Sequence, residues 1–246
     1  IEKLDFSTII SNNIDPYNYD PNKKYKKEEY PFIYKLSNDK LNNLEIKTVY
    51  VFDHSINPEI KKLPVYKIMD ALSKLDKYER NFKIGSMVLN IRKREINELM
   101  ENYLNPLMEI KNFNLGIGIG DDKYEIQKDI YDNNIEEVIK KIIDNKSFQE
   151  NNVNLVIGGS SQKLNALALK YGLGTNQWEG DIINLLKKIE VHSKAKSKEL
   201  NVSYCTKDLS FDGKTISQDN FEIIYVLSEK KSFNKQIDEI EKQCLN

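Results

Sequence analysis

The residues best placed to do chemistry follow two short apolar runs. Asp53 and His54 close the run KTVYVFDH, and Asp121 and Asp122 close the stretch NFNLGIGIGDD. A carboxylate beside an imidazole at the end of a strand is suited to the edge of an active site. A structural role for His54 stays an alternative, because it has no histidine partner at helical or strand spacing.

The stretch from Asn112 to Tyr124 carries glycine at every second position. In a strand, Gly116, Gly118 and Gly120 share one face, while the leucine and isoleucines between them share the other. Such a bare face lets a helix, another backbone or a ligand come close, and we expect a helix to pack there. The spacing differs from G-x-G-x-x-G, so we exclude a dinucleotide fingerprint.

Two further patterns allow an alternative chemistry. The turn Gly158-Gly159-Ser160-Ser161 opens a helical pattern and could hold a phosphate, but it lacks a lysine, which favours an ordinary turn. Asp53, Glu59 and Lys61 are the residue types of a metal nuclease, but Pro58 interrupts the strand that such a set needs. The sequence has no G-x-S-x-G, H-E-x-x-H or Walker motif.

Composition limits the class of protein. The chain has 246 residues, 39% of them hydrophobic, so it can bury a large core. Its 37 lysines and arginines balance 38 acidic residues, so a nucleic acid or an anionic membrane would have to be met by a local patch. Two cysteines and no long apolar run predict a protein of a reducing cytoplasm without a membrane partner.

Strand and helix patterns alternate from Lys47 onward. We expect strands at 47–53 and 153–159, and a hairpin at 82–91 that turns at Gly85 and Ser86. Amphipathic patterns between them predict helices, one of which should break near Asn105 because Pro106 follows. The fold class is therefore α/β (α+β), a mixed sheet with helices packed on it.

The order of these elements resembles the palm of the nucleotidyl-cyclase group, which includes GGDEF-type domains, and within it the SatD family. Asp132-Asn133-Asn134 falls at the family's acidic-glycine step, and QWEGDIINLLKKI is similar to its tryptophan-containing helix. HSKAKSKELNVSYCTKDL, residues 192–209, has the outline of its helix-turn-helix. The resemblance covers residues 47–210 and implies a palm-like core.

A palm of this kind holds Mg²⁺ or Mn²⁺ and a nucleotide between two carboxylates. Asp53 would be the first ligand; the hairpin turn has Ser86 where the second is expected, leaving Asp121 and Asp122 as substitutes. The resemblance implies a nucleotide site at Asp53, His54, Ser86, Gly116, Gly118 and Gly120. With one ligand missing, we expect little or no turnover and a regulatory, nucleotide-responsive or partner-binding module. The alternatives are an active metal-dependent enzyme acting through Asp53, and a structural or interaction protein.

Four lysines of the predicted helix-turn-helix form a local positive patch that could contact DNA phosphates. These residues are Lys194, Lys196, Lys198 and Lys207. A solvated helix face is the alternative. We divide the chain into a polar arm at 1–46, a palm-like core at 47–174 and a C-terminal segment at 175–246.

Overall fold

The computed structural model describes most of the chain after residue 45. The described residues are 5–9, 22, 24, 46–63, 65–77, 80–126, 130–195, 202–214, 216 and 221–244. Within this part of the chain, no helix is long and apolar enough to cross a membrane.

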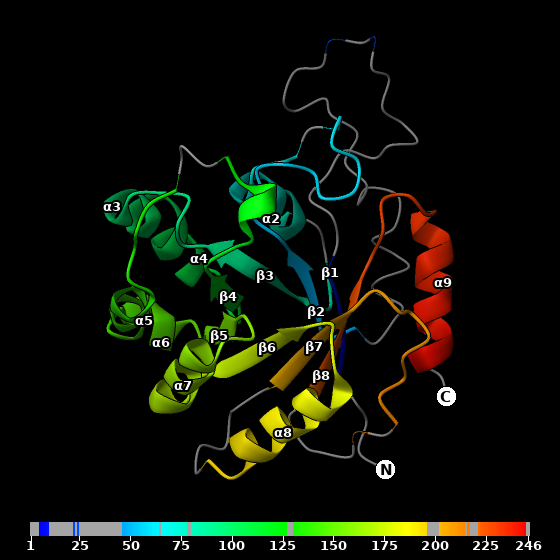
Figure 1. The fold of residues 1–246 in the computed structure, drawn as a ribbon. Helices are drawn as coiled ribbons and strands as arrows, with labels where there is room; N and C mark the ends of the chain where they lie inside the picture. Colours follow the sequence, from blue (N-terminus) through cyan, green and yellow to red (C-terminus); the bar gives the residue numbers. More distant parts are fainter. Residues whose placement is uncertain are drawn as a thin grey trace.

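Within the described ranges, eight parallel strands form a closed barrel in the order in which they follow one another in the sequence (Figure 1). They are β1 (Asp5–Ile9), β2 (Thr48–Val51), β3 (Lys83–Asn90), β4 (Asn114–Gly118), β5 (Asn154–Gly158), β6 (Gly174–Trp178), β7 (Val202–Thr206) and β8 (Phe221–Val226). β1 closes the barrel by pairing with both β2 and β8. The predicted α/β class is confirmed, but the architecture is a parallel barrel of the TIM class, not a palm.

Helices surround the barrel on its outside (Figure 1). They are α2 (Ile68–Asp76), α3 (Ile96–Leu99), α4 (Asn105–Met108), α5 (Ile135–Ile143), α6 (Lys146–Glu150), α7 (Gln162–Tyr171), α8 (Ile182–Ser193) and α9 (Phe233–Cys244). A π-helical turn, Met100–Leu104, joins α3 to α4, and a 3₁₀ turn covers Asp122–Tyr124. The sequence explains where several helices begin. The side chains of Asn134, Ser161 and Asp181 accept hydrogen bonds from backbone N–H groups in the first turns of α5, α7 and α8.

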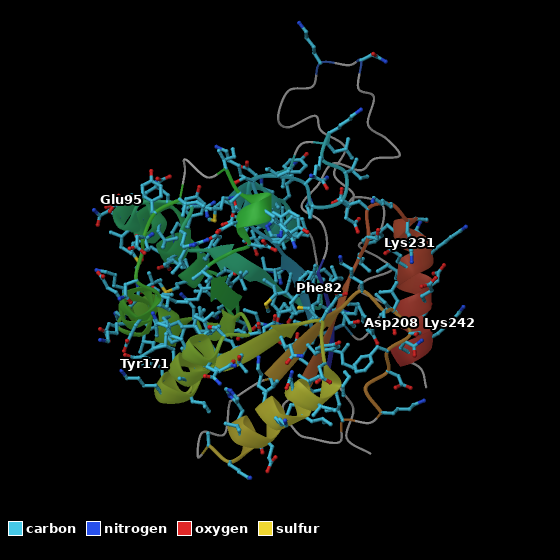
Figure 2. The ribbon with its side chains drawn as sticks, in the orientation of Figure 1. Phe82, Glu95, Tyr171, Asp208, Lys231 and Lys242 are labelled. Atoms are coloured by element: carbon cyan, nitrogen blue, oxygen red, sulfur yellow. The ribbon has the colours of Figure 1, made fainter. Side chains whose placement is uncertain are left out.

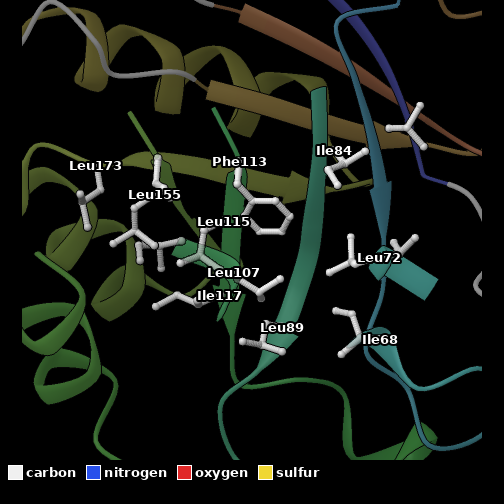
Figure 3. Close-up of a cluster of buried hydrophobic side chains, with 14 of the residues drawn as sticks. Ile68, Leu72, Ile84, Leu89, Leu107, Phe113, Leu115, Ile117, Leu155 and Leu173 are labelled. Carbon is white, nitrogen blue, oxygen red and sulfur yellow. The ribbon is translucent and has the colours of Figure 1, made fainter. Parts of the chain in front are cut away.

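Two layers of apolar side chains hold the barrel together. Outward-facing residues of the strands, such as Leu115, Ile117 and Leu155, pack against the helices (Figure 3). The barrel interior is filled by a smaller cluster, with Val65, Val88 and Val226 packed on it; its buried members are Tyr50, Phe52, Met87, Val156, Cys205 and Ile224. Charged side chains such as Glu95, Lys231 and Lys242 lie on the outside (Figure 2).

The predicted hairpin at 82–91 is wrong. Residues 83–90 form one strand, β3, which pairs with β2 on one side and β4 on the other. The predicted strand at 47–53 and the glycine-bearing strand β4 therefore share a sheet but are separated by β3. The Gly85-Ser86 pair that suggested a turn lies inside β3, where a Cβ atom at Gly85 would collide with the carbonyl oxygen of Asn114.

The glycine face of β4 lies inside the barrel, and the described atoms nearest to it belong to strands rather than to a helix. A Cβ atom added at Gly118 would lie 2.8 Å from Cγ2 of Val88. One added at Gly116 would collide with the carbonyl oxygen of Ser86. The close approach that the glycines allow is therefore to β3, and the helices cover the opposite face.

Strands from all three predicted segments belong to the same barrel: β1 from 1–46, β2 to β5 with the start of β6 from 47–174, and β7 and β8 from 175–246. The helix that was expected to break near Asn105 continues through Pro106 to Met108, since Pro106 stands in the first turn of α4.

Candidate active site

The carboxyl ends of β2, β3 and β4 bring a group of charged side chains together. Asp53 and His54 follow β2, Lys93 and Arg94 follow β3, and Glu125 lies in the segment after β4. Because the three strands are parallel neighbours, their ends meet at one edge of the barrel. This is the end of an α/β barrel at which enzymes of the class carry their active sites.

Asp53 is buried and fully paired. Its carboxylate accepts two hydrogen bonds from the guanidinium of Arg94, one of them 2.9 Å long, and one of 2.9 Å from Lys93. The backbone N–H of Asn90 adds a bond of 3.1 Å. Burial by itself lowers the pKa of Arg94, but the hydrogen bonds and charge of Asp53 outweigh it and raise that pKa above its ordinary value. Asp53 thus anchors the two cations and has no oxygen left for a metal.

His54 and Glu125 form a second, incompletely bonded pair. The imidazole lies between the rings of Phe52 and Tyr124, with centroid distances of 4.7 and 4.8 Å. Its Nδ1 atom lies 3.6 Å from Oε1 of Glu125, and neither atom has a hydrogen-bond partner among the described residues. Oε2 of Glu125 accepts a bond of 2.8 Å from the hydroxyl of Ser55. An unpaired buried carboxylate oxygen is costly, so this pair is a candidate for function.

Backbone and side-chain bonds fix the segment after β2. The N–H groups of Ser55 and Ile56 donate to the carbonyl of Tyr124 at 3.2 and 3.1 Å, which places His54 beside Glu125. The Asn57 amide donates to Glu229, after β8, at 2.7 Å. The pair is therefore held by rigid neighbours on both sides.

A small hollow opens beside this pair. It has a volume of about 180 Å³ and is lined by Ser55, Lys93, Glu125, Ile126 and Tyr131. Pockets that hold whole drug-sized ligands or cofactors measure roughly 300 to 1,000 Å³. The hollow formed by these residues is therefore the size of a small substrate.

The other predicted nucleotide-binding residues lie apart from the hollow. Ser86 and Gly116 are buried in neighbouring strands, where the Ser86 hydroxyl donates to the Gly116 carbonyl at 2.9 Å. Gly118 faces Val88 inside the barrel, and Gly120, with φ of +70°, lies against Asn90. Only Asp53 and His54 of the predicted set belong to the charged group.

The two aspartates after β4 are exposed and paired with cations. Asp121 lies 2.8 Å from Lys123, whose hydrogen bond lowers the pKa of the carboxyl, and Asp122 pairs with Arg92. Across the described residues, no three histidine, cysteine or acidic side chains come together as a metal would require. Asp53 lies among its own partners, separate from these aspartates.

The predicted helix-turn-helix is wrong. Residues 202–206 form β7, a buried strand of the barrel, so the second helix does not exist. Lys194 follows α8 and pairs with Glu190, while Lys207 follows β7. Lys196 and Lys198 lie outside the described residues.

Sequence reasoning missed Lys93, Arg94 and Glu125. The run Arg92-Lys93-Arg94 holds two of the three arginines of the sequence and stands directly after a strand, a position that could have marked it. Glu125 carries no local signal, because only the folding of its segment onto the end of β2 brings it to His54.

Comparisons with known proteins show which solved structures share this fold. No family model matches the sequence, and a search of curated proteins found no match. Among solved structures, the chain is similar to a coenzyme F420-dependent tetrahydromethanopterin reductase from Methanopyrus kandleri, with a TM-score of 0.57 and 13% identity over 84% of this chain and 68% of that one.

Two further structures show the same fold. An F420-dependent secondary alcohol dehydrogenase, solved with an F420-acetone adduct, gives a TM-score of 0.57 at 11% identity over 98% of this chain and 91% of that one. The oxygenating component of a type II Baeyer-Villiger monooxygenase from Pseudomonas putida, solved with FMN, gives 0.53 at 10% identity, over 82% and 66%. At these identities the likeness establishes the fold.

These findings overturn the palm interpretation. The chain has the barrel fold of F420- and FMN-dependent oxidoreductases, so the resemblance to the SatD family and GGDEF-type palms is wrong. The regulatory function, the Mg²⁺ or Mn²⁺ site and the DNA-binding role rested on that palm and its appended helices, and they are wrong with it. The metal-dependent alternative acting through Asp53 is also contradicted, because the neighbours are named for F420 or were solved with FMN, and the Asp53 carboxylate is held by Arg94 and Lys93. The predicted nucleotide partner stays a prediction.

Proposed function

We infer that this chain is an oxidoreductase that uses a flavin or deazaflavin at the carboxyl end of its barrel. The observation that carries the proposal is the His54–Glu125 pair, whose facing atoms lie 3.6 Å apart and lack other partners. Two of the structural neighbours are named for F420 and a third was solved with FMN, which supports the cofactor class.

The residues present fit the flat ring system of such a cofactor. Phe52, Val88 and Val226 belong to or pack on the apolar cluster of the barrel interior, and Val88 and Val226 remain partly exposed. Glycines after β4 and β5 keep the neighbouring loops free of bulky side chains, with Gly159 at a φ of +122°. An apolar floor beside an incompletely bonded polar pair suits an aromatic ring that reacts at its edge.

The cofactor, when bound, supplies the acceptor or donor for a hydride. The side chains of this chain handle the accompanying proton. His54 accepts a proton from a substrate hydroxyl, or returns it to a carbonyl oxygen, and the Glu125 carboxylate stabilises the imidazolium that forms. Ser55 and Lys93 orient Glu125 through its other oxygen, at 2.8 and 3.8 Å. Phe52 and Tyr124 hold the imidazole plane and limit its contact with water.

Titration of the protein with F420 and with FMN, monitored through the fluorescence of the cofactor, tests whether the protein binds a cofactor of this class. Turnover of a panel of small alcohols and carbonyl compounds tests whether the protein is an oxidoreductase. We expect His54→Ala to bind cofactor like the parent and to react about 10² to 10⁴ times more slowly, as for loss of a general acid-base.

Glu125→Gln should also slow the reaction, whereas Glu137→Gln, at an exposed position of α5, serves as the matched control. Failure to bind either cofactor would overturn the proposal. Parental rates in His54→Ala would overturn the role of the pair.

A further inference from the structure

A tryptophan side chain lies exposed at the carboxyl end of the barrel. Trp178 is the last residue of β6 and is 47% exposed. Its partner in the parallel ladder is Cys205, which belongs to the apolar cluster of the barrel interior. Two positions before it, the side chain of Asn176 reaches Sγ of Cys205 at 3.2 Å, and residues i and i+2 of a strand share a face. Trp178 therefore projects toward the barrel axis, and its exposed surface lies at the open end of the interior.

The backbone at the end of β6 is held in place by hydrogen bonds. Glu179 and Gly180 have φ of 48° and 91°, so the chain turns sharply directly after the tryptophan. The N–H of Glu179 donates to the carbonyl of Cys205 at 2.8 Å, and the Gln177 amide donates to the carbonyl of Glu179 at 3.1 Å. The hydroxyl of Tyr204 donates to the carbonyl of Gly180 at 3.4 Å. A non-glycine residue keeps a positive φ only where its surroundings hold it, so this turn fixes the backbone from which the indole projects.

The apolar floor of the barrel mouth extends toward this tryptophan. The two methyl groups of Val88, on β3, point to Gly118 of β4 and to Gly158 of β5, so one side chain spans three strands. β5 is the neighbour of β6 in the barrel. Val226, the last residue of β8, packs on the same interior cluster. The mouth thus has a floor of aliphatic side chains that ends beside an indole wall.

This wall and the His54–Glu125 pair lie on opposite sides of the mouth. His54 follows β2 and Trp178 ends β6, four strands apart in the described barrel of eight. A flat ring on the floor between them has the polar pair at one edge and the indole at the other. Aromatic rings attract one another in offset-stacked or edge-to-face contacts, and tryptophan offers a large surface for either.

We propose that Trp178 is the aromatic wall of the cofactor site, and that the flat ring system of a flavin or deazaflavin packs against its indole at the mouth of the barrel. The identity of this ring as a redox cofactor rests on the proposed oxidoreductase function. The preference for a flat aromatic ligand rests on the placement of Trp178 and Val88, so the two can fail separately.

The indole can be observed by itself, because the sequence contains a single tryptophan. Protein labelled with ¹⁵N gives one indole N–H signal, and an aromatic ring in contact with the indole shifts this signal through its ring current. Two parts of FMN serve as probes: lumiflavin is the ring without the ribityl phosphate, and ribitol 5-phosphate is the tail without the ring. Lumiflavin should shift the indole signal of the whole protein, and ribitol 5-phosphate should not. An indole signal that stays in place with lumiflavin would overturn the proposal, as would an equal shift with ribitol 5-phosphate.

Variants separate contact from effects at a distance. Trp178→Ala should weaken lumiflavin binding about tenfold, measured through the fluorescence of lumiflavin, whereas Trp178→Phe keeps a ring and should weaken it less than about threefold. Val191→Ala, at a 52% exposed position near the far end of α8, is the matched control and should bind lumiflavin like the parent. Parental affinity in Trp178→Ala would refute the wall. The indole signal of the parent needs no substitution, so it tests the proposal even where a variant fails to fold.

Titrations with FMN and F420 separate this inference from the proposed function. If either cofactor binds to Trp178→Ala as tightly as to the parent, the wall is refuted and the oxidoreductase stands. If lumiflavin shifts the indole signal while neither cofactor binds, the aromatic site stands and the oxidoreductase falls.

Discussion

Val88 fills space that two glycines leave open, and this contact can be tested by substitution. A Cβ atom at Gly158 would lie closer than 3.0 Å to Cγ1 of Val88, and one at Gly118 would lie 2.8 Å from Cγ2. The two methyl groups thus point to glycines of different strands. Rotation of Val88 would exchange one collision for the other, and a β-branched side chain has few rotamers.

Gly158→Ala should therefore destabilise the protein by about 1 to 3 kcal/mol, the usual range for overpacking a filled interior. For a chain of this length the melting temperature should fall by roughly 2 to 4 °C for each kcal/mol. Val88→Ala alone should cost on the order of 1 kcal/mol, because it removes two methyl groups from a partly buried position.

The double variant decides between packing and other causes. With Val88 shortened, the nearest remaining atoms lie 3.5 Å from the new Cβ, an ordinary contact. Gly158→Ala should then cost little, so the double variant should be more stable than the sum predicts by about 1 to 3 kcal/mol. Urea unfolding of the four proteins measures this coupling. Additivity within about 0.5 kcal/mol would refute the reasoning, because it would mean that Gly158 and Val88 do not share the space.

Three other outcomes follow from buried groups. Arg94→Met should lower the free energy of unfolding by about 3 to 5 kcal/mol in urea, since it leaves the buried Asp53 carboxylate without its main partner, and a loss under about 1 kcal/mol would contradict that account. Burial lowers the pKa of Lys188 from 10.5 to about 8, so the unfolded chain binds more protons between these values and the stability of the parent should rise with pH across this interval. A Lys188→Met variant should lose this rise when unfolding is measured at several pH values, and an identical slope would show that another group is responsible. Burial raises the pKa of the Cys205 thiol to about 12, so in a Cys244→Ser background it should react with iodoacetamide only as fast as the fold opens, and rapid labelling of the native protein would refute its burial.

The local elements of this fold were open to prediction from the sequence. The runs around Tyr50 and Ile157 are short, apolar and rich in β-branched residues, and the stripe from Ile135 to Ile142 has helical spacing, so β2, β5 and α5 were expected where they occur. Alternation also assigned the glycines of β4 to one face. These features are local, because side-chain direction in a strand or helix depends on the backbone of that element alone.

The sequence also marked part of the candidate site. Asp53 and His54 were singled out because they end a strand, and both lie in the charged group. The role of each residue could not be predicted from its neighbours in the sequence. Asp53 anchors Arg94 and Lys93, and His54 faces Glu125. These partners are about 40 and 70 residues away in the chain.

Tertiary structure alone decided that the sheet closes. A buried parallel strand is apolar on both faces whether its sheet is open or closed, so its pattern does not distinguish a palm from a barrel. Closure depends on β1 pairing with β8, across more than 200 residues, through backbone groups that every sequence carries. The pairing of β2 with β3 and of β3 with β4 is likewise between backbones of separate segments, and it places the ends of these strands at one rim, where Lys93, Arg94 and Glu125 join Asp53 and His54.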